Sequence, residues 1–294
     1  MEHQPLITKG WVRGSLYLLV LIFALFVFGT LGYIFISAVS IGLQADMQLK
    51  SKENIHLLVI YYFFIAAGVT LVTFLIRKHI DRKTIRSIGF QTAHLKKDVI
   101  IGAVTGLVTI LTGFGILYIS GLLLIEGIVP DLNYLTGILF VFILVSWNEE
   151  VAFRGYVLNN LMESMNPYLA LIVSSFMFAL FHTLNPGLST LSFFNLFLAG
   201  LLLGIVFIHT RTIWYALSLH FFWNFLQGPV LGFRVSGTEA AGLIEISTTG
   251  PDYLTGGDFG FEGSVISSVL IIICIIILNN YYNKSDNMAL EKRH

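Results

Sequence analysis

The side chains best suited to chemistry in this sequence are a few ionisable and amide groups that interrupt long apolar stretches. They form three short groups: Glu149, Glu150 and Arg154; Phe178 and His182; His220 and Asn224. An ionisable residue within a membrane span costs about 2.5–3.5 kcal/mol on insertion scales, so its presence needs a reason. Carboxylates and imidazoles transfer protons, and amides stabilise an oxyanion, so hydrolysis is one such reason.

The two adjacent glutamates have different expected roles. Neighbouring positions on a helix point about 100° apart, so the two carboxylates cannot share one task. Glu150 precedes Arg154 by four residues, the favourable order for an ion pair along a helix. This spacing predicts a Glu150–Arg154 pair and leaves Glu149 for proton chemistry. The alternative is a helix that ends at Trp147, with all three charged side chains solvated.

The histidines have both functional and packing interpretations. His182 alone is more typical of a histidine that only packs within a bundle than of a catalytic residue. His220 and Asn224 are four residues apart and share a helix face. An amide on that face can orient the imidazole or donate a hydrogen bond to an oxyanion. The alternative is that both polar side chains only hold neighbouring helices together.

Depth along the chain favours the functional interpretation. The strong turn signal between the two relevant stretches is Asn166-Pro167; Glu149 lies 17 residues before Asn166, and His182 lies 16 residues after it. In an antiparallel helical hairpin both would lie about 25 Å from the turn. We therefore expect Glu149, His182 and His220 to converge inside the bilayer.

The elements that position these residues are expected to be membrane helices. The chain has 294 residues, 56% hydrophobic and only 12% charged, whereas a soluble domain has about 25% charged residues. We predict an all-α integral membrane fold, a single domain over residues 1–294, whose bundle of about eight helices encloses an intramembrane cavity. Stretches with few or no charges place the spans near residues 15–41, 56–76, 99–125, 132–162, 167–184, 190–209, 212–231 and 264–278. The first stretch is too long for a cleavable signal peptide.

Orientation follows from the basic residues of the loops. The segment Arg77–Lys97 holds seven lysines and arginines, and both tails carry basic residues: Lys9, Arg13, Lys284, Lys292 and Arg293. The long loop Gly232–Gly263 has one arginine and five acidic residues. We therefore predict cytoplasmic termini and a site that opens toward the cytoplasm. Lys50 and Lys52, which would lie on the opposite side, do not fit this charge pattern. The basic segment is interpreted as an anchor at the lipid surface, with a specific lipid-binding patch as the alternative. A net charge of zero argues against nucleic-acid binding.

Taken in order, the three groups resemble the motifs of the CPBP (Abi) family of CAAX prenyl endopeptidases and bacteriocin-processing proteins. The family pattern is Glu-Glu-x-x-x-Arg, Phe-x-x-x-His and His-x-x-x-Asn, and the resemblance covers a catalytic core at about residues 98–231. The segment 250–260 is also similar to a loop of bacterial members, which implies a bacterial cell membrane. The resemblance implies hydrolysis of a peptide bond in a membrane-associated or lipidated protein or peptide.

The resemblance also implies a role for each motif residue. Glu149 would be the general base that activates water, and His182 would position that water. His220 and Asn224 would stabilise the oxyanion. The supporting residues would be Glu150, Arg154 and Phe178.

Three alternatives remain open at the level of sequence. Glu149, His182 and His220 match the His₂Glu set of zinc hydrolases. We favour a metal-free site without cofactor, because the His-Glu-x-x-His signature is absent. In a zinc site Glu150 would also be the remaining candidate base, although it is expected to pair with Arg154. The same groups could also form the relay of a proton-coupled transporter, although no internal repeat is visible. The last alternative is a non-catalytic immunity or scaffold protein of the same fold.

Overall fold

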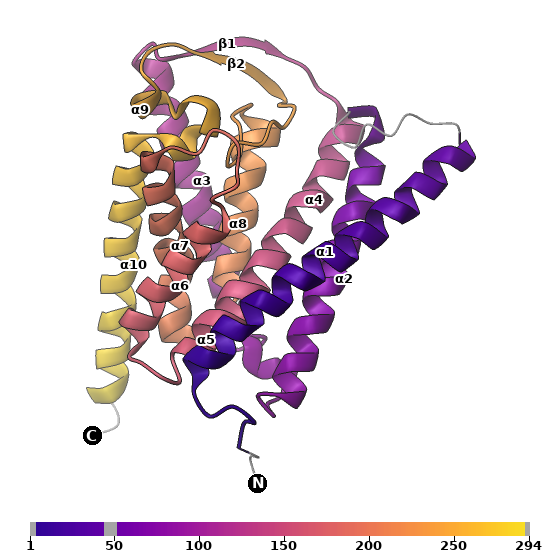
Figure 1. Cartoon of the computed structure of the whole chain (residues 1–294). Coiled ribbons are helices and arrows are strands. Elements are labelled where there is room, and N and C mark those ends of the chain that lie inside the picture. Colours follow the sequence, from indigo (N-terminus) through magenta and orange to yellow (C-terminus); the bar gives the residue numbers. More distant parts are fainter. Residues whose placement is uncertain (1–3, 44–51, 292–294) are drawn as a thin grey trace. The chain divides into compact units, whose positions relative to one another are not determined.

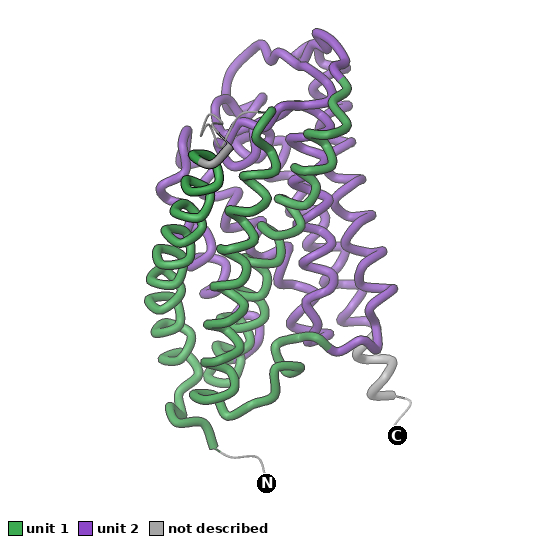
Figure 2. Tube along the Cα trace, turned by 90° about the vertical axis from the view of Figure 1, so that its right-hand side faces the viewer, with its two compact units in different colours: residues 1–90, 130–165 green, residues 91–129, 166–294 purple. Residues whose placement is uncertain are grey.

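The computed structural model of the chain describes residues 4–43 and 52–291. Three of the basic residues used to orient the chain, Lys50, Lys292 and Arg293, lie outside the described residues. The chain divides into two compact units, residues 1–90 with 130–165 (unit 1) and residues 91–129 with 166–294 (unit 2), coloured separately in Figure 2. The expected single domain over residues 1–294, the core at 98–231 and the enclosed cavity stay predictions.

Unit 1 is built from long helices. They are α1 (Gly10–Leu43), α2 (Ile55–His79) and α4 (Leu132–Glu150), with 3₁₀ turns at Lys52–Asn54 and Ile85–Ile88. The chain continues from α4 through a π-helical segment, Val151–Leu158, into the short α5 (Asn159–Leu161). Asp131 begins α4 by accepting a hydrogen bond from the backbone N–H of Tyr134 at 2.9 Å, which satisfies one of the free donors of the first turn.

Unit 2 combines helices with a two-stranded sheet. Its helices are α3 (Leu95–Ile119), α6 (Pro167–Phe181), α7 (Thr190–Thr210), α8 (Trp214–Phe225), α9 (Asp252–Thr255) and α10 (Val265–Glu291). A π-helical segment, Leu226–Val230, continues α8, and 3₁₀ turns occupy Gly257–Phe259 and Phe261–Gly263. The sheet pairs β1 (Leu123–Ile128) with β2 (Ile244–Thr248) and lies at the opposite end of this unit from the end of α10 (Figure 1).

The helices identify the chain as an integral, multi-pass membrane protein. Among the described residues, six helical stretches are long and apolar enough to span a membrane: residues 10–41, 52–79, 95–119, 132–161, 190–210 and 265–284. The other two expected spans are shorter, since α6 has 15 residues and α8 has 12. The structure therefore supports six of the roughly eight membrane spans that the sequence predicted.

The all-α prediction is wrong at the end of the third expected span. That span was placed at residues 99–125, but α3 ends at Ile119 and β1 follows. Gly121, with φ at +70°, breaks the helix in a conformation that disfavours other residues. Leu123 then pairs with Thr248 and Ile128 with Ile244 in an antiparallel register. A short apolar run is compatible with either a strand or a helix, so the sequence alone did not predict β1.

A close approach of backbones positions α8 against α3. A Cβ added to Gly102 would lie 2.4 Å from the carbonyl oxygen of Tyr215, and one added to Gly106 would lie 3.2 Å from the backbone nitrogen of Trp223. Two glycines four residues apart allow membrane helices to pack this closely. Since α8 carries His220 and Asn224, these glycines help to fix where that part of the site lies within unit 2.

Candidate active site

The glutamate motif (Glu149, Glu150 and Arg154) lies inside a continuous helix of unit 1. Glu150 is 0% exposed and Arg154 is 1% exposed. An Arg154 Nη1–H donates to Glu150 Oε1 at 3.0 Å, which confirms the predicted ion pair. The alternative of a helix that ends at Trp147 is wrong, because the helix continues through Val151–Leu158 to Leu161.

The turn that follows Glu150 is π-helical. Every residue of Val151–Leu158 is buried, and a Cβ added to Gly155 would lie 2.4 Å from Ile88 Cγ2. A π-helical turn replaces i→i−4 hydrogen bonds by wider ones and is frequent at functional sites. The motif therefore sits where an α-helix changes into a π-helix, with no room for a larger residue at Gly155.

Glu149 lies in a different environment from its neighbour. Its side chain is partly exposed, whereas Glu150 is enclosed. Tyr62 of α2 and the Arg154 guanidinium lie within electrostatic range of the Glu149 carboxylate. Two residues earlier, the Trp147 indole N–H donates to Thr70 Oγ1 at 2.8 Å, and the Trp147 ring stacks on Phe90 at 5.5 Å. These contacts fix α4 against α2 at the level of Glu149.

The basic segment corrects one interpretation. Arg77 was expected at the lipid surface, but it is 2% exposed and donates to Asp81 Oδ2 at 2.8 Å. Arg13 of the N-terminal tail is equally buried and lies 3.3 Å from Asp81 Oδ1. Tyr156 donates to the same Oδ1 at 2.9 Å. Burial of two arginines requires this shared carboxylate, so both have a structural role within unit 1.

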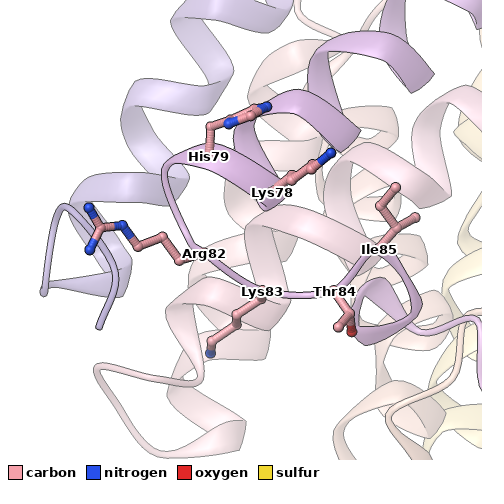
Figure 3. Close-up of a pocket in the computed structure, with 6 residues that line it drawn as sticks. All are labelled: Lys78, His79, Arg82, Lys83, Thr84 and Ile85. Atoms are coloured by element: carbon pink, nitrogen blue, oxygen red, sulfur yellow. The ribbon is translucent and has the colours of Figure 1, made fainter. Parts of the chain in front are cut away.

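Other basic residues of this segment do face outward. Lys78, His79 and Arg82 are exposed and line a pocket of about 820 Å³ at the end of α2, together with Lys83, Thr84 and Ile85 (Figure 3). Lys83 is held by Glu163 at 2.7 Å. The expectation of a lipid-anchoring surface therefore stays a prediction for the outward residues and no longer applies to Arg77.

His182 ends α6 of unit 2. Asn166 begins this helix by accepting from Leu169 N–H at 2.9 Å, with Pro167 in the first turn, as the turn signal predicted. His182 Nδ1 lies 2.8 Å from the Phe178 carbonyl oxygen. A carbonyl only accepts, so Nδ1 is the donor, and neutral His182 carries its lone pair on Nε2. The Phe178 ring, 4.5 Å from the imidazole, packs against it.

His220 and Asn224 both lie on α8, four residues apart, as the spacing predicted. They are 8% and 6% exposed. Positions four apart share a helix face, so an amide and an imidazole are presented together. This face can donate two hydrogen bonds to one developing negative charge.

In unit 2 a third ionisable residue, beside the two motif histidines, was missed. Glu262 was counted only among the acidic residues of the long loop, since nothing in its spacing points to His182 or His220. Its Oε1 accepts from the Trp223 indole N–H at 3.1 Å, and its Oε2 accepts from the Ser236 backbone N–H and hydroxyl, both at 2.7 Å. Burial raises the pKa of this carboxyl. The hydrogen bonds from Ser236 and the electrostatic effect of His182 and His220 act in the opposite direction and lower it.

Comparison with known protein families decides which family these motifs belong to. Residues 131–226 match the family model for the Rce1-like type II CAAX prenyl endopeptidase. The chain contains an Rce1-like CAAX endopeptidase domain. This match covers about a third of the chain, begins at the residue that caps α4, ends just after α8 and includes all three motifs. No curated protein and no solved structure shows a significant match.

The match of residues 131–226 to this family model points to an intramembrane protease. The roles that the resemblance gives to Glu149, His182, His220 and Asn224 stay predictions. Among the described residues, no group of three or more histidine, cysteine, aspartate or glutamate side chains is arranged to hold a metal ion.

The histidine side of the Rce1-like domain lies next to the long loop. The Asn185 amide of the turn after His182 donates to the Ser236 carbonyl at 3.0 Å, and a Cβ added to Gly187 would lie 3.0 Å from Asp258. Charge patterning predicts this loop on the side away from the cytoplasm. The expected cytoplasmic opening therefore finds no support in unit 2.

Proposed function

We propose that this chain is an intramembrane endopeptidase that hydrolyses a peptide bond in a membrane-associated or lipidated protein or peptide. The observation that carries this proposal is the Rce1-like match over residues 131–226, with the three motifs in family order inside it. The buried Glu150–Arg154 pair supports it, because a scaffold has no need for such a motif within an apolar helix.

In the proposed reaction, Glu149 is the general base. Its carboxylate takes a proton from a water molecule, and the resulting hydroxide attacks the carbonyl carbon of the scissile bond. The protonated Glu149 then gives that proton to the leaving amine. Glu149 is the suitable glutamate because Glu150 is engaged by Arg154 at 3.0 Å.

The histidines and the amide serve the water and the oxyanion. His182 Nε2, left as acceptor by the Nδ1 contact with Phe178, orients the attacking water. The Asn224 amide and a ring N–H of His220 donate to the oxyanion of the tetrahedral intermediate. Phe178 supports His182 through its carbonyl and its ring.

Purified protein in liposomes tests the proposal with membrane-embedded peptides, prenylated and unprenylated. Mass spectrometry of the products should show one new amine and one new carboxyl terminus per cut, with no proton flux across the vesicle. Proton flux without cleavage would favour the transporter alternative. Neither activity, with intact folding, would favour a non-catalytic role.

A further inference from the structure

Unit 2 contains a carboxylate, Glu262, that belongs to none of the three motifs yet lies within electrostatic range of both motif histidines. It is partly buried, in the 3₁₀ turn just before α10. Both of its oxygens accept hydrogen bonds, so its orientation is fixed rather than free to rotate. Glu262 is therefore a carboxylate of fixed orientation within electrostatic range of two imidazoles.

The first of these hydrogen bonds ties Glu262 to α8. The Trp223 indole donates to Glu262 Oε1 at 3.1 Å. Trp223 follows His220 by three residues, and positions three apart on a helix lie on the same face. The carboxylate is therefore held at the face of α8 that also carries His220.

The second set of hydrogen bonds ties Glu262 to the turn that carries His182. Ser236 donates to Glu262 Oε2 through its backbone N–H and its hydroxyl, both at 2.7 Å. The Ser236 carbonyl accepts from the Asn185 amide at 3.0 Å, and Asn185 N–H donates to the His182 carbonyl at 3.0 Å. Ser236 adopts φ of +47°, an unfavourable value for a residue other than glycine, so this arrangement has a conformational cost.

The backbone of Glu262 is anchored as firmly as its side chain. The buried Asn195 amide of α7 donates to the carbonyl oxygens of Glu262 at 2.7 Å and Ser264 at 2.8 Å. Ser268 of α10 in turn donates to Asn195 Oδ1 at 2.5 Å. A carboxylate supported on several elements is preorganised, as residues that orient a reactive group need to be.

We propose that Glu262 is a positioning residue of the proteolytic site, a carboxylate that orients the imidazoles of His182 and His220 and favours the N–H donor form of His220. The inference rests on the proposed function, in which His220 donates to the oxyanion. A carboxylate that holds a histidine in its donor form is a recurrent device of hydrolases. Arg234 of the same loop is engaged by Asp258 and Glu239. Among the described residues, the ionisable side chains that act electrostatically on Glu262 are His182 and His220.

The test compares Glu262→Gln with Glu239→Gln. Both changes remove one carboxylate from the same loop, but the Glu239 side chain is 78% exposed and contacts Arg234 alone among the residues named here. In Glu262→Gln, kcat should fall at least about tenfold with KM unchanged, and the pH–rate profile should move toward lower pH. Glu239→Gln should change neither. A structural role alone would lower the melting temperature without moving the profile.

A second measurement is independent of turnover. The imidazole ¹⁵N resonances of labelled protein in liposomes, assigned with His182→Gln and His220→Gln, should shift in Glu262→Gln and partly in Trp223→Phe. Unchanged resonances would overturn the inference, and so would shifted resonances in an active enzyme with unaltered kcat and profile. A wild type that cleaves no peptide overturns the proposed function, while the resonances still decide whether Glu262 orients the histidines.

Discussion

Glu149 and Glu150 are adjacent in the chain, but their surroundings differ. Glu150 is completely buried and pairs with Arg154, whereas Glu149 is partly exposed. Both charges of a buried ion pair depend on each other for compensation. A buried arginine that loses its carboxylate is left with an uncompensated charge, whereas Glu149 as a residue is partly exposed although its Oε2 is buried. The two residues should therefore respond differently to the same substitution.

Glu149→Gln should abolish cleavage and leave folding intact, because it removes the base but keeps the shape. The loss of a general base is worth about 10²–10⁴ in rate. Glu150→Gln should lower stability as well, by about 3–5 kcal/mol, because it leaves Arg154 uncompensated. Purified yield, melting temperature and turnover of both variants check this. A fully active Glu149→Gln enzyme would remove Glu149 from its assigned role.

A second residue-scale prediction concerns metal. In a zinc-dependent site, Glu149, His182 and His220 would be ligands, and Glu150 would have to act as base while it is held by Arg154 at 3.0 Å. We therefore expect less than one zinc per chain by elemental analysis. Activity should survive prolonged treatment with a membrane-permeant chelator, because the proposed glutamate–histidine site uses no metal that a chelator could remove.

The metal prediction has a clear opposite outcome. Stoichiometric zinc that is lost with activity in His182→Ala, together with chelator inactivation reversed by added metal, would make Glu149 a ligand. The His182→Ala variant serves as the control, because it removes one proposed ligand without touching the Glu150–Arg154 pair.

Residue spacing predicted the contacts that are local along a helix. The Glu150–Arg154 pair, the shared helix face of His220 and Asn224 and the turn at Asn166 all follow from neighbours within four residues. Glu262 could not be found this way, because its partner Trp223 is 39 positions away along the chain. Contacts between distant segments depend on packing, which a single sequence does not reveal.

At the scale of elements, backbone contact between α3 and α8 positions the histidine of the third motif. A Cβ added to Gly102 would lie 2.4 Å from the carbonyl oxygen of Tyr215. This is a backbone atom, so it cannot make room by a change of side-chain rotamer. Gly113 of the same helix faces the Phe261 ring, next to Glu262 in the chain. The small residues of α3 therefore fix both α8 and the turn that holds Glu262.

Gly102→Ala should destabilise the protein and lower its activity, because the new methyl group would lie 2.4 Å from the Tyr215 carbonyl oxygen. Overpacking of this kind costs about 1–3 kcal/mol. Gly115→Ala on the same helix is the matched control, since nothing lies within 4 Å of its added Cβ. Melting temperature and turnover of both variants check this; equal effects would mean that helix propensity, not contact with α8, dominates.

Two element-level features were not predictable. The apolar run that ends at Ile125 gave no sign of where the helix stops and β1 begins, since Leu and Ile suit both structures. The π-helical segment Val151–Leu158 depends on a shift in hydrogen-bond register that has no residue signature. The helices themselves were predictable, because a spanning segment must satisfy its backbone internally.

At the scale of the whole molecule, the apolar surface indicates lipid as the solvent. Large apolar side chains of α1 are widely exposed, among them Leu19 at 66%, Phe23 at 67% and Phe26 at 71%. A water-soluble protein rarely exposes a contiguous apolar surface of this kind. In a bilayer the same surface is in its preferred environment. The orientation of the spans must then be decided by the loops, where the basic residues are unevenly distributed.

We predict that both termini and the segment Arg77–Lys97 face the cytoplasm and that the long loop faces the other side. Single cysteines at Ala93 and at Tyr253 would test this in a Cys274→Ala background, because Ala93 is exposed within the basic segment and Tyr253 is 57% exposed in α9 of the long loop. An impermeant thiol reagent on intact cells should label the Tyr253 position alone, and permeabilised cells should label both. Labelling of the Ala93 position alone would reverse the topology. It would also turn the histidine side of unit 2, which adjoins the long loop, toward the cytoplasm, so the same experiment decides from which side a substrate reaches His182.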